Sequence, residues 1–143
     1  MKKQLTQLLA LHEGFREKPY RCTAGKLTVG YGRNLDDRGI TREEGAILLA
    51  NDLELSEAIL RDRVSCFDDL SEVRQAVLID MCLNLGWPRL SGFRKFLAAL
   101  EEGSYSRAAA EMMNSLWARQ VGRRAIRLAD MMLRNVWPLE VAA

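Results

Sequence analysis

The sequence is poor in several residue types, and each shortage excludes a class of protein. His12 is the only histidine in 143 residues, which rules out metal sites built on a pair of histidines. Three cysteines, at positions 22, 66 and 82, form an odd set without C-x-x-C spacing, so we expect reduced thiols. No run of 18 apolar residues occurs, so the sequence predicts no membrane-spanning helix. We also expect no signal peptide, because the first residues mix leucine with polar side chains.

An excess of charge of one sign is also missing. The chain has 21 Lys and Arg against 19 Asp and Glu, a net charge of +2, and 48% of its residues are hydrophobic. This composition is ordinary for a globular protein and excludes a disordered chain. A chain of this length is typical of one domain, with a core that buries roughly two thirds of the unfolded surface.

The order of sequence patterns predicts a predominantly helical α+β fold. Leucines at helical spacing predict a first helix over about 3–13. Glycines and the β-favouring run Leu27 to Tyr31 then predict a small hairpin-like lobe over about 14–40. Thr41 and Glu44 match a capping box, which predicts a long linking helix over about 41–63.

The remainder, about 64–143, is expected to form a larger helical lobe. Ser71 precedes a segment, Val73 to Leu85, that is apolar nearly all round, so we expect this helix at the centre of the core. Three further helical patterns cover about 90–102, 106–117 and 122–135. The predicted architecture is a single domain over 1–143, with the 1–13 helix packed at the junction of the two lobes.

Two charged residues occupy positions that suit apolar side chains. Glu13 lies four residues after Leu9, on the apolar face and in the last turn of the first helix, where the helix dipole and partial burial both favour the protonated carboxyl. Such a group suits a general acid, although a carboxylate at a frayed helix end facing solvent is the alternative. Arg124 borders the inward face of the last helix and requires either an anionic partner or a solvent-directed head.

Other polar residues allow a functional and an ordinary interpretation. Asp80 and Asn84 share one face of the central helix and either line a cleft or form internal hydrogen bonds. His12 is expected at the surface. Four arginines form a stripe on and just before the last helix: Arg119, Arg123, Arg127 and Arg134. We expect this stripe to be a solvated face, and the alternative is a surface that binds nucleic acid or lipid.

The spacing of three residues near the N-terminus, Glu13, Cys22 and Thr28, is specific enough to indicate a family. Glu13 is followed after eight residues by Cys22 and after five more by Thr28, within a sequence that reads Glu13-Gly14, Tyr20, Thr28, Gly30 and Gly32. This resembles the active-site signature of the phage-type lysozymes, the family 24 glycoside hydrolases of T-even and lambdoid bacteriophages. Their second catalytic position is Asp or Cys. The similarity extends through the segments that begin at Gly39, Val73, Gly92 and Gly122. The stretch between Gly32 and Gly39 is short compared with the T-even members.

The resemblance implies a lysozyme-like fold and hydrolysis of the β-1,4 bond between N-acetylmuramic acid and N-acetylglucosamine in peptidoglycan, without a metal or cofactor. It assigns Glu13 as general acid, Cys22 as base or nucleophile, and Thr28 as the residue that orients water, and it pairs Arg124 with Glu13. We further expect Tyr31, Asn84 and Gln120 to bind substrate. Inverting stereochemistry is implied, whereas direct attack by Cys22 gives retention. The alternative base is Glu17, Asp36 or Asp37, with Cys22 as a packing residue.

The resemblance also implies a biological setting. We expect a monomeric endolysin made in the host cytoplasm, which reaches the periplasmic wall when a holin opens the membrane and then lyses the cell. Two other classes compete with this interpretation. One is a peptidoglycan-binding module without catalysis, and the other is a helical nucleic-acid binder, which the small net charge disfavours.

Overall fold

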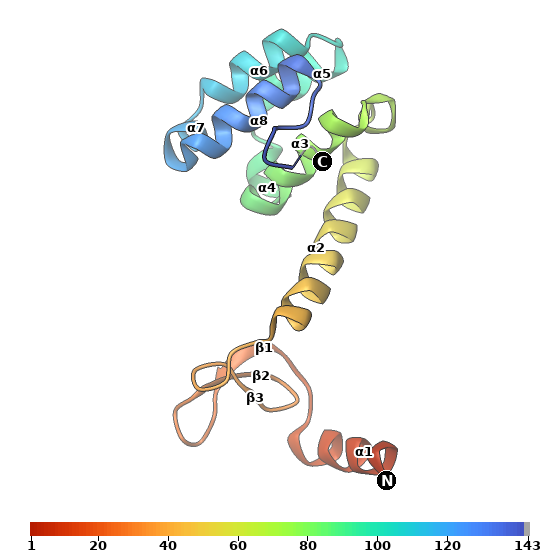
Figure 1. Ribbon diagram of the computed structural model, residues 1–143, viewed down its shortest axis with the longest axis vertical. Helices are drawn as coiled ribbons and strands as arrows, with labels where there is room; N and C mark the ends of the chain where they lie inside the picture. The colour runs from red at the N-terminus through yellow and green to blue at the C-terminus, as the bar shows by residue number, and fades with distance from the viewer. Residues whose placement is uncertain (142–143) are drawn as a thin grey trace. The chain divides into compact units, whose positions relative to one another are not determined.

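The computed structural model describes residues 1–141 and has the predicted helical α+β fold (Figure 1). The chain divides into two compact units, an N-terminal unit, Met1–Leu48, and a C-terminal unit that begins at Leu49. The expected packing of the first helix at the junction of the two lobes stays a prediction.

The N-terminal unit contains one helix, a small sheet and the start of a second helix. Helix α1 (Lys2–Glu13) matches the predicted first helix and ends at Gly14, whose φ is +68°. Three antiparallel strands follow in the order β1-β2-β3, namely β1 (Arg16–Arg21), β2 (Leu27–Gly30) and β3 (Arg33–Asn34). The register of β1 against β2 is irregular between Arg16 and Tyr20. Pro19 lies in that interval and has no N–H to donate, which suits a strand at the sheet edge.

The capping box predicted at the start of the linking helix is confirmed. Helix α2 (Arg42–Arg63) begins directly after Thr41. The backbone N–H of Glu44 donates to Thr41 Oγ1 at 3.1 Å, and the backbone N–H of Thr41 donates to Glu44 Oε1 at 2.8 Å. Two otherwise unpaired backbone donors are therefore satisfied by the two side chains.

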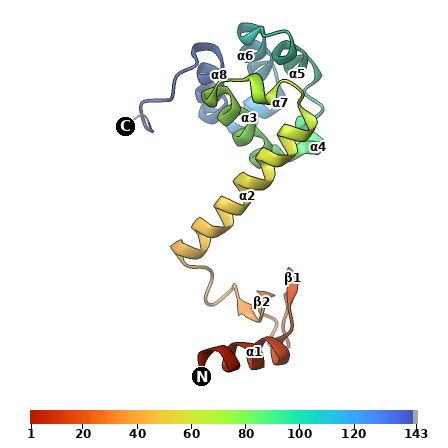
Figure 2. The same cartoon turned by 90° about the vertical axis from the view of Figure 1, so that its right-hand side faces the viewer.

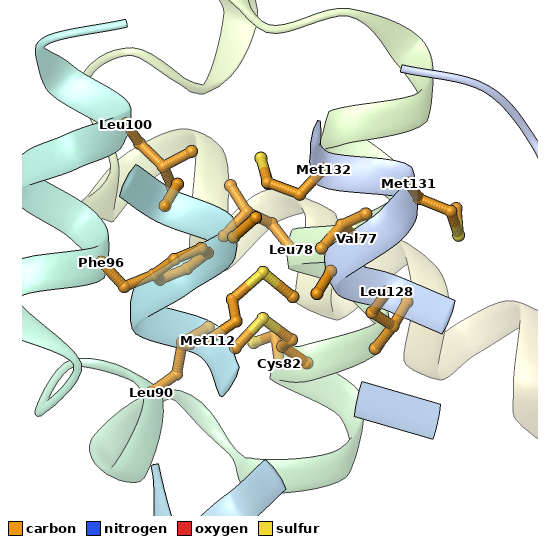
Figure 3. Close-up of a cluster of buried hydrophobic side chains, with 14 of the residues drawn as sticks. Val77, Leu78, Cys82, Leu90, Phe96, Leu100, Met112, Leu128, Met131 and Met132 are labelled. Atoms are coloured by element: carbon orange, nitrogen blue, oxygen red, sulfur yellow. The ribbon is translucent and has the colours of Figure 1, made fainter. Parts of the chain in front are cut away.

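The C-terminal unit forms around α3 (Glu72–Leu85), as the nearly all-apolar pattern predicts. Ser71 caps this helix by accepting the backbone N–H of Arg74. Figure 3 shows Val77 and Leu78 from this helix among Phe96, Met112 and Met132, all of which are buried. A short 3-10 helix, η1 (Phe67–Asp69), precedes it, and five further α-helices follow it: α4 (Trp87–Leu90), α5 (Arg94–Glu101), α6 (Tyr105–Met113), α7 (Leu116–Val121) and α8 (Arg123–Arg134).

The helix expected over 106–117 is divided in two, which corrects the sequence prediction. Helix α6 ends at Met113, and Ser115 begins α7 by accepting the backbone N–H of Ala118. The Ser115 hydroxyl also donates to the carbonyl of Met112 at 2.7 Å. Serine side chains compete with the helical backbone for hydrogen bonds in this way, and the helix is therefore interrupted at Ser115. The apolar periodicity continues across the interruption and does not reveal it. Helices α6 and α8 pack side by side, as Figures 1 and 2 both show.

Candidate active site

Glu13 is the last residue of α1, and its carboxylate lies against Gly32. A Cβ added to Gly32 would meet Glu13 Oε2 at 2.7 Å and Cδ at 3.0 Å. The backbone turns away at Gly14, whose N–H closes the helix on the carbonyl of Ala10. Glu13 is exposed within its unit, so residues 1–48 do not supply the partial burial expected from its position on the helix. Gly32 lies between β2 and β3, so the acidic group reaches the sheet.

Cys22 occupies the tight turn between β1 and β2. Its N–H donates to the carbonyl of Lys26 at 2.9 Å, and its carbonyl accepts the N–H of Gly25 at 2.8 Å. Gly25 has φ of +76°, a conformation that favours glycine. Because of this turn the backbone N–H groups of Lys26 and Ala24 point at the sulfur, and they hold the pKa of the half-buried Cys22 thiol below its ordinary value.

Thr28 is buried beside Cys22, at 3% exposure, on the central strand β2. Its hydroxyl donates to the carbonyl of Lys26 at 2.8 Å, and it also lies within hydrogen-bonding reach of the Cys22 sulfur, where it contributes to the lowered pKa. The hydroxyl has one proton and two lone pairs, so it can donate to one group and accept from another. Cys22 and Thr28 are therefore neighbours in the structure.

Two of the three acidic residues considered as alternative bases, Asp36 and Asp37, take part in holding this turn. Asp36 Oδ2 accepts the backbone N–H of Leu27 at 2.7 Å, and Asp37 accepts the Lys26 ammonium at 3.1 Å. Arg21, which is adjacent to Cys22 in the sequence, donates to the carbonyl of Gly25, and its Nη1 lies 3.6 Å from Asp36 Oδ2. The lowered pKa of Cys22 thus comes from backbone N–H groups, with no contribution from the adjacent arginine.

Tyr31 is exposed at the edge of an open groove in the N-terminal unit. The groove has a volume of about 490 Å³ and is bounded by the end of β2 and the first two turns of α2, including Ile40 and Ile47. The Tyr31 ring packs against Phe15, with 5.2 Å between ring centroids. An aromatic side chain on an open groove suits the role expected for it in binding a sugar face, which stays a prediction.

In the C-terminal unit Arg124 pairs with Asp80. Arg124 Nε donates to Asp80 Oδ1 at 2.7 Å, and both side chains are about two-fifths exposed. The anionic partner that the position of Arg124 requires is therefore present on α3. Its pairing with Glu13, which belongs to the N-terminal unit, stays a prediction.

Asn84 and Gln120, the other expected substrate contacts, also lie in the C-terminal unit. Asn84 Oδ1 accepts a hydrogen bond from the indole N–H of Trp117 at 2.7 Å, which fixes the orientation of its amide. Both Asn84 and Gln120 are exposed. Asp80 and Asn84 thus form internal hydrogen bonds while both side chains stay accessible. That this helix face lines a cleft stays a prediction.

The arginine stripe is partly neutralised. Arg127 pairs with Glu140 at 3.4 Å and Arg134 with Asp130 at 3.1 Å. This arrangement favours a solvated face over a nucleic-acid surface, which needs a concentrated positive field. Over residues 1–141 no helix is both long and apolar enough to cross a membrane. The same part of the chain holds no cluster of three His, Cys, Asp or Glu side chains placed to bind a metal ion.

The structure thus joins two pairs of residues within the N-terminal unit, Cys22 with Thr28 and Glu13 with Gly32. Sequence reasoning missed two features of this site. The first is the stabilisation of the Cys22 sulfur by the N–H groups of Lys26 and Ala24, for which the turn residue Gly25 was the available signal. The second is the contact between the Glu13 carboxylate and Gly32, which no local pattern indicates.

Comparisons with known proteins identify the family to which this chain is similar. Residues 10–134 match the family model described as phage lysozyme. An endolysin of Acyrthosiphon pisum secondary endosymbiont phage 1 is 31% identical over 121 residues, which cover 82% of this chain and 80% of the relative. A probable T4-type lysozyme 1 of Dictyostelium discoideum is 24% identical over 157 residues, with 90% and 92% of the two chains covered.

Proposed function

The chain belongs to the phage lysozyme family, and we propose that it is an endolysin. It hydrolyses the β-1,4 bond between N-acetylmuramic acid and N-acetylglucosamine in peptidoglycan and thereby lyses the host cell. The observation that carries this proposal is the family match over residues 10–134, which includes Glu13, Cys22 and Thr28 in their characteristic spacing. Catalysis at this bond requires an acid and a second group across the sugar from it.

In this proposal Glu13 is the general acid. Its carboxyl gives a proton to the glycosidic oxygen as the bond from that oxygen to C1 of N-acetylmuramic acid breaks. The position of the carboxylate against Gly32 supports this role, because Gly32 lies in the turn that follows β2, the strand that carries Thr28. Arg124 is proposed to pair with Glu13 once substrate is bound.

Cys22 is proposed as the base. In the inverting reaction a water molecule, oriented by the Thr28 hydroxyl, forms the new bond to C1 and gives its proton to the Cys22 thiolate. The lowered pKa of Cys22 supports this role because a thiol must be ionised to accept that proton. If the sulfur instead bonds to C1 directly, water hydrolyses that intermediate in a second step and the configuration is retained. The anomer first formed, observed by NMR, distinguishes the two routes.

Three further residues are proposed to bind the glycan. Tyr31 is proposed to stack on a sugar ring, and the exposed amides of Asn84 and Gln120 are proposed to hydrogen-bond its acetamido and hydroxyl groups. The fixed orientation of Asn84 by Trp117 supports this, since a preoriented amide loses less freedom on binding.

Mass analysis of fragments released from purified peptidoglycan tests the proposed reaction. Hydrolysis gives fragments with a reducing N-acetylmuramic acid end. An anhydro sugar would identify a lytic transglycosylase instead, and binding without any released fragment would identify a recognition module. In the same assay Glu13→Gln is expected to abolish release. Full activity of that variant would show that Glu13 is not the general acid.

The proposed setting is that of an endolysin that accumulates as a monomer in the host cytoplasm and acts in the periplasm. A holin-type membrane protein is proposed to provide access to the wall. Expression without a holin should therefore leave cells intact until the membrane is permeabilised. Lysis at the same rate without permeabilisation would contradict the need for a partner.

A further inference from the structure

Gly32 differs from the other glycines with positive φ in the part of the chain that the structure describes. Its φ is +80°, and a Cβ at this position would lie 2.7 Å from Glu13 Oε2. None of the other glycines in that conformation has a heavy atom within 3.4 Å of the corresponding position. The backbone conformation alone therefore explains glycine elsewhere, whereas at position 32 a side chain would also occupy the space of a carboxylate.

We propose that Gly32 is a positioning residue for Glu13: the space left by its missing side chain seats the carboxylate against the turn between β2 and β3. This inference rests on the proposed function of Glu13 as general acid. The distance from a Cβ added at position 32 decreases along the Glu13 side chain, from 3.4 Å at Cγ to 3.0 Å at Cδ and 2.7 Å at Oε2, so the carboxylate end reaches deepest into this space.

The position of the Glu13 carboxylate against Gly32 affects catalysis because it fixes where the acid lies relative to Thr28 and Cys22. Gly32 follows β2 by two residues, and Thr28 lies within β2, beside Cys22. The short backbone between Thr28 and Gly32 therefore sets how far the carboxylate lies from the water-orienting hydroxyl. A catalytic group displaced by about 1 Å can lose on the order of a hundredfold in rate. A methyl group at position 32 pushes the carboxylate out of its seat by a comparable amount.

The displaced group is the free end of an exposed side chain, so it moves aside without disturbing the fold. Gly32→Ala is therefore expected to lower kcat by about tenfold or more while KM on soluble glycan strands stays within about twofold. Gly39→Ala is the matched control. Gly39 belongs to the same unit and has φ of +64°, but the nearest atom to its added Cβ, the carbonyl oxygen of Leu35, is 3.9 Å away. This control carries the same kind of backbone strain without touching Glu13.

A double-mutant cycle separates positioning from a general structural effect. Glu13→Asp shortens the side chain by one methylene group and withdraws the carboxylate from the methyl group of Ala at position 32. In the Glu13→Asp background, Gly32→Ala is expected to cost no more activity than Gly39→Ala does. Thermal unfolding of all variants, followed by circular dichroism, establishes that each is folded at the assay temperature.

The inference is overturned if Gly32→Ala and Gly39→Ala reduce kcat equally, or if Gly32→Ala costs as much in the Glu13→Asp background as in the wild type. Both results would leave the proposed function intact, provided that Glu13→Gln is inactive. If Glu13→Gln keeps full activity, the proposed acid fails, and the positioning role fails with it.

Discussion

The Arg33 guanidinium binds both oxygens of the Glu44 carboxylate, with Nη1 2.8 Å from Oε1. This pair joins β3 to the first turn of α2, and Glu44 at the same time completes the capping box with Thr41. Arg33 also donates to the carbonyl of Gly39 at 3.1 Å. One arginine thus holds together the short segment between the sheet and the linking helix.

Stability should depend on pH through Glu44. The hydrogen bonds from Arg33 and Thr41 lower its pKa from an ordinary value near 4.5 to about 2. Because the folded-state pKa is depressed, the contribution to stability is fully present above about pH 4.5 and is lost as the pH falls toward 2. Glu44→Gln is therefore expected to lower Tm relative to the wild type at neutral pH, and this difference should shrink below pH 4.5. Thermal unfolding between pH 2 and 7 measures it.

Glu43→Gln serves as the control for that experiment. Glu43 lies in the same first turn of α2 and is exposed, and it makes no side-chain hydrogen bond within residues 1–141. A Tm difference for Glu44→Gln that stayed constant down to pH 2 would contradict the assigned role of the ion pair.

Alkylation should distinguish the three thiols. Backbone N–H groups lower the pKa of Cys22, whereas burial raises the pKa of Cys66 to about 11 and also raises that of Cys82. Since the thiolate is the reactive form, iodoacetamide at neutral pH is expected to modify Cys22 first. Peptide mass mapping over time measures the three rates. In urea the rates should become similar, and faster labelling of Cys66 in the folded protein would refute the assignment.

Substitutions of Cys22 test its proposed role as base. Cys22→Asp places a carboxylate in the same turn and is expected to keep much of the activity, because a carboxylate accepts a proton at neutral pH. Cys22→Ser keeps the size but has no group that ionises near neutrality, so a loss of about a hundredfold or more in kcat is expected. Turbidity clearing of outer-membrane-permeabilised cells measures both variants. Unchanged activity of Cys22→Ser would show that the thiol takes no part in the reaction, and Glu17 would then be the alternative base to test.

The hydroxyl of Thr28 should matter for both stability and rate. Thr28→Val removes the hydrogen bond to the carbonyl of Lys26 in a buried position and is expected to cost about 1–3 kcal/mol of unfolding free energy. It should also slow hydrolysis, because no group then orients the attacking water. Thr28→Ser retains the hydroxyl and is expected to keep most of the activity. If Thr28→Val and Thr28→Ser hydrolyse glycan equally well, the water-orienting role is wrong.

Arg124 offers a test of the predicted pairing between the two units. Its ion pair with Asp80 is about two-fifths exposed, so breaking that pair with Asp80→Asn should cost only about 0–1 kcal/mol of stability. If Arg124 also pairs with Glu13 during catalysis, Arg124→Gln lowers kcat, whereas Asp80→Asn, which leaves the arginine charge in place, does not. Denaturant unfolding and kcat are measured on both variants. Equal kcat losses in the two variants would indicate that only the Asp80 pair matters.

Local sequence determined most of the secondary structure. Thr41 with Glu44, and Ser71 before the apolar segment, mark helix starts because caps satisfy backbone donors within three residues. The all-apolar face of α3 likewise predicts its place in the core. The break at Ser115 was missed because hydrophobic spacing continues through it, so that periodicity alone does not distinguish one helix from two.

The sequence by itself also determined which residues to consider, through the spacing of Glu13, Cys22 and Thr28. Only the tertiary structure decided how they are held. Backbone N–H groups, and not Arg21, act on Cys22; Glu13 lies against Gly32; and Asp80 holds Arg124. The physical reason is that electrostatics and close contacts depend on distances in space. The chain brings Glu13 within reach of Gly32, and Asp80 within reach of Arg124, only after strands and helices have packed.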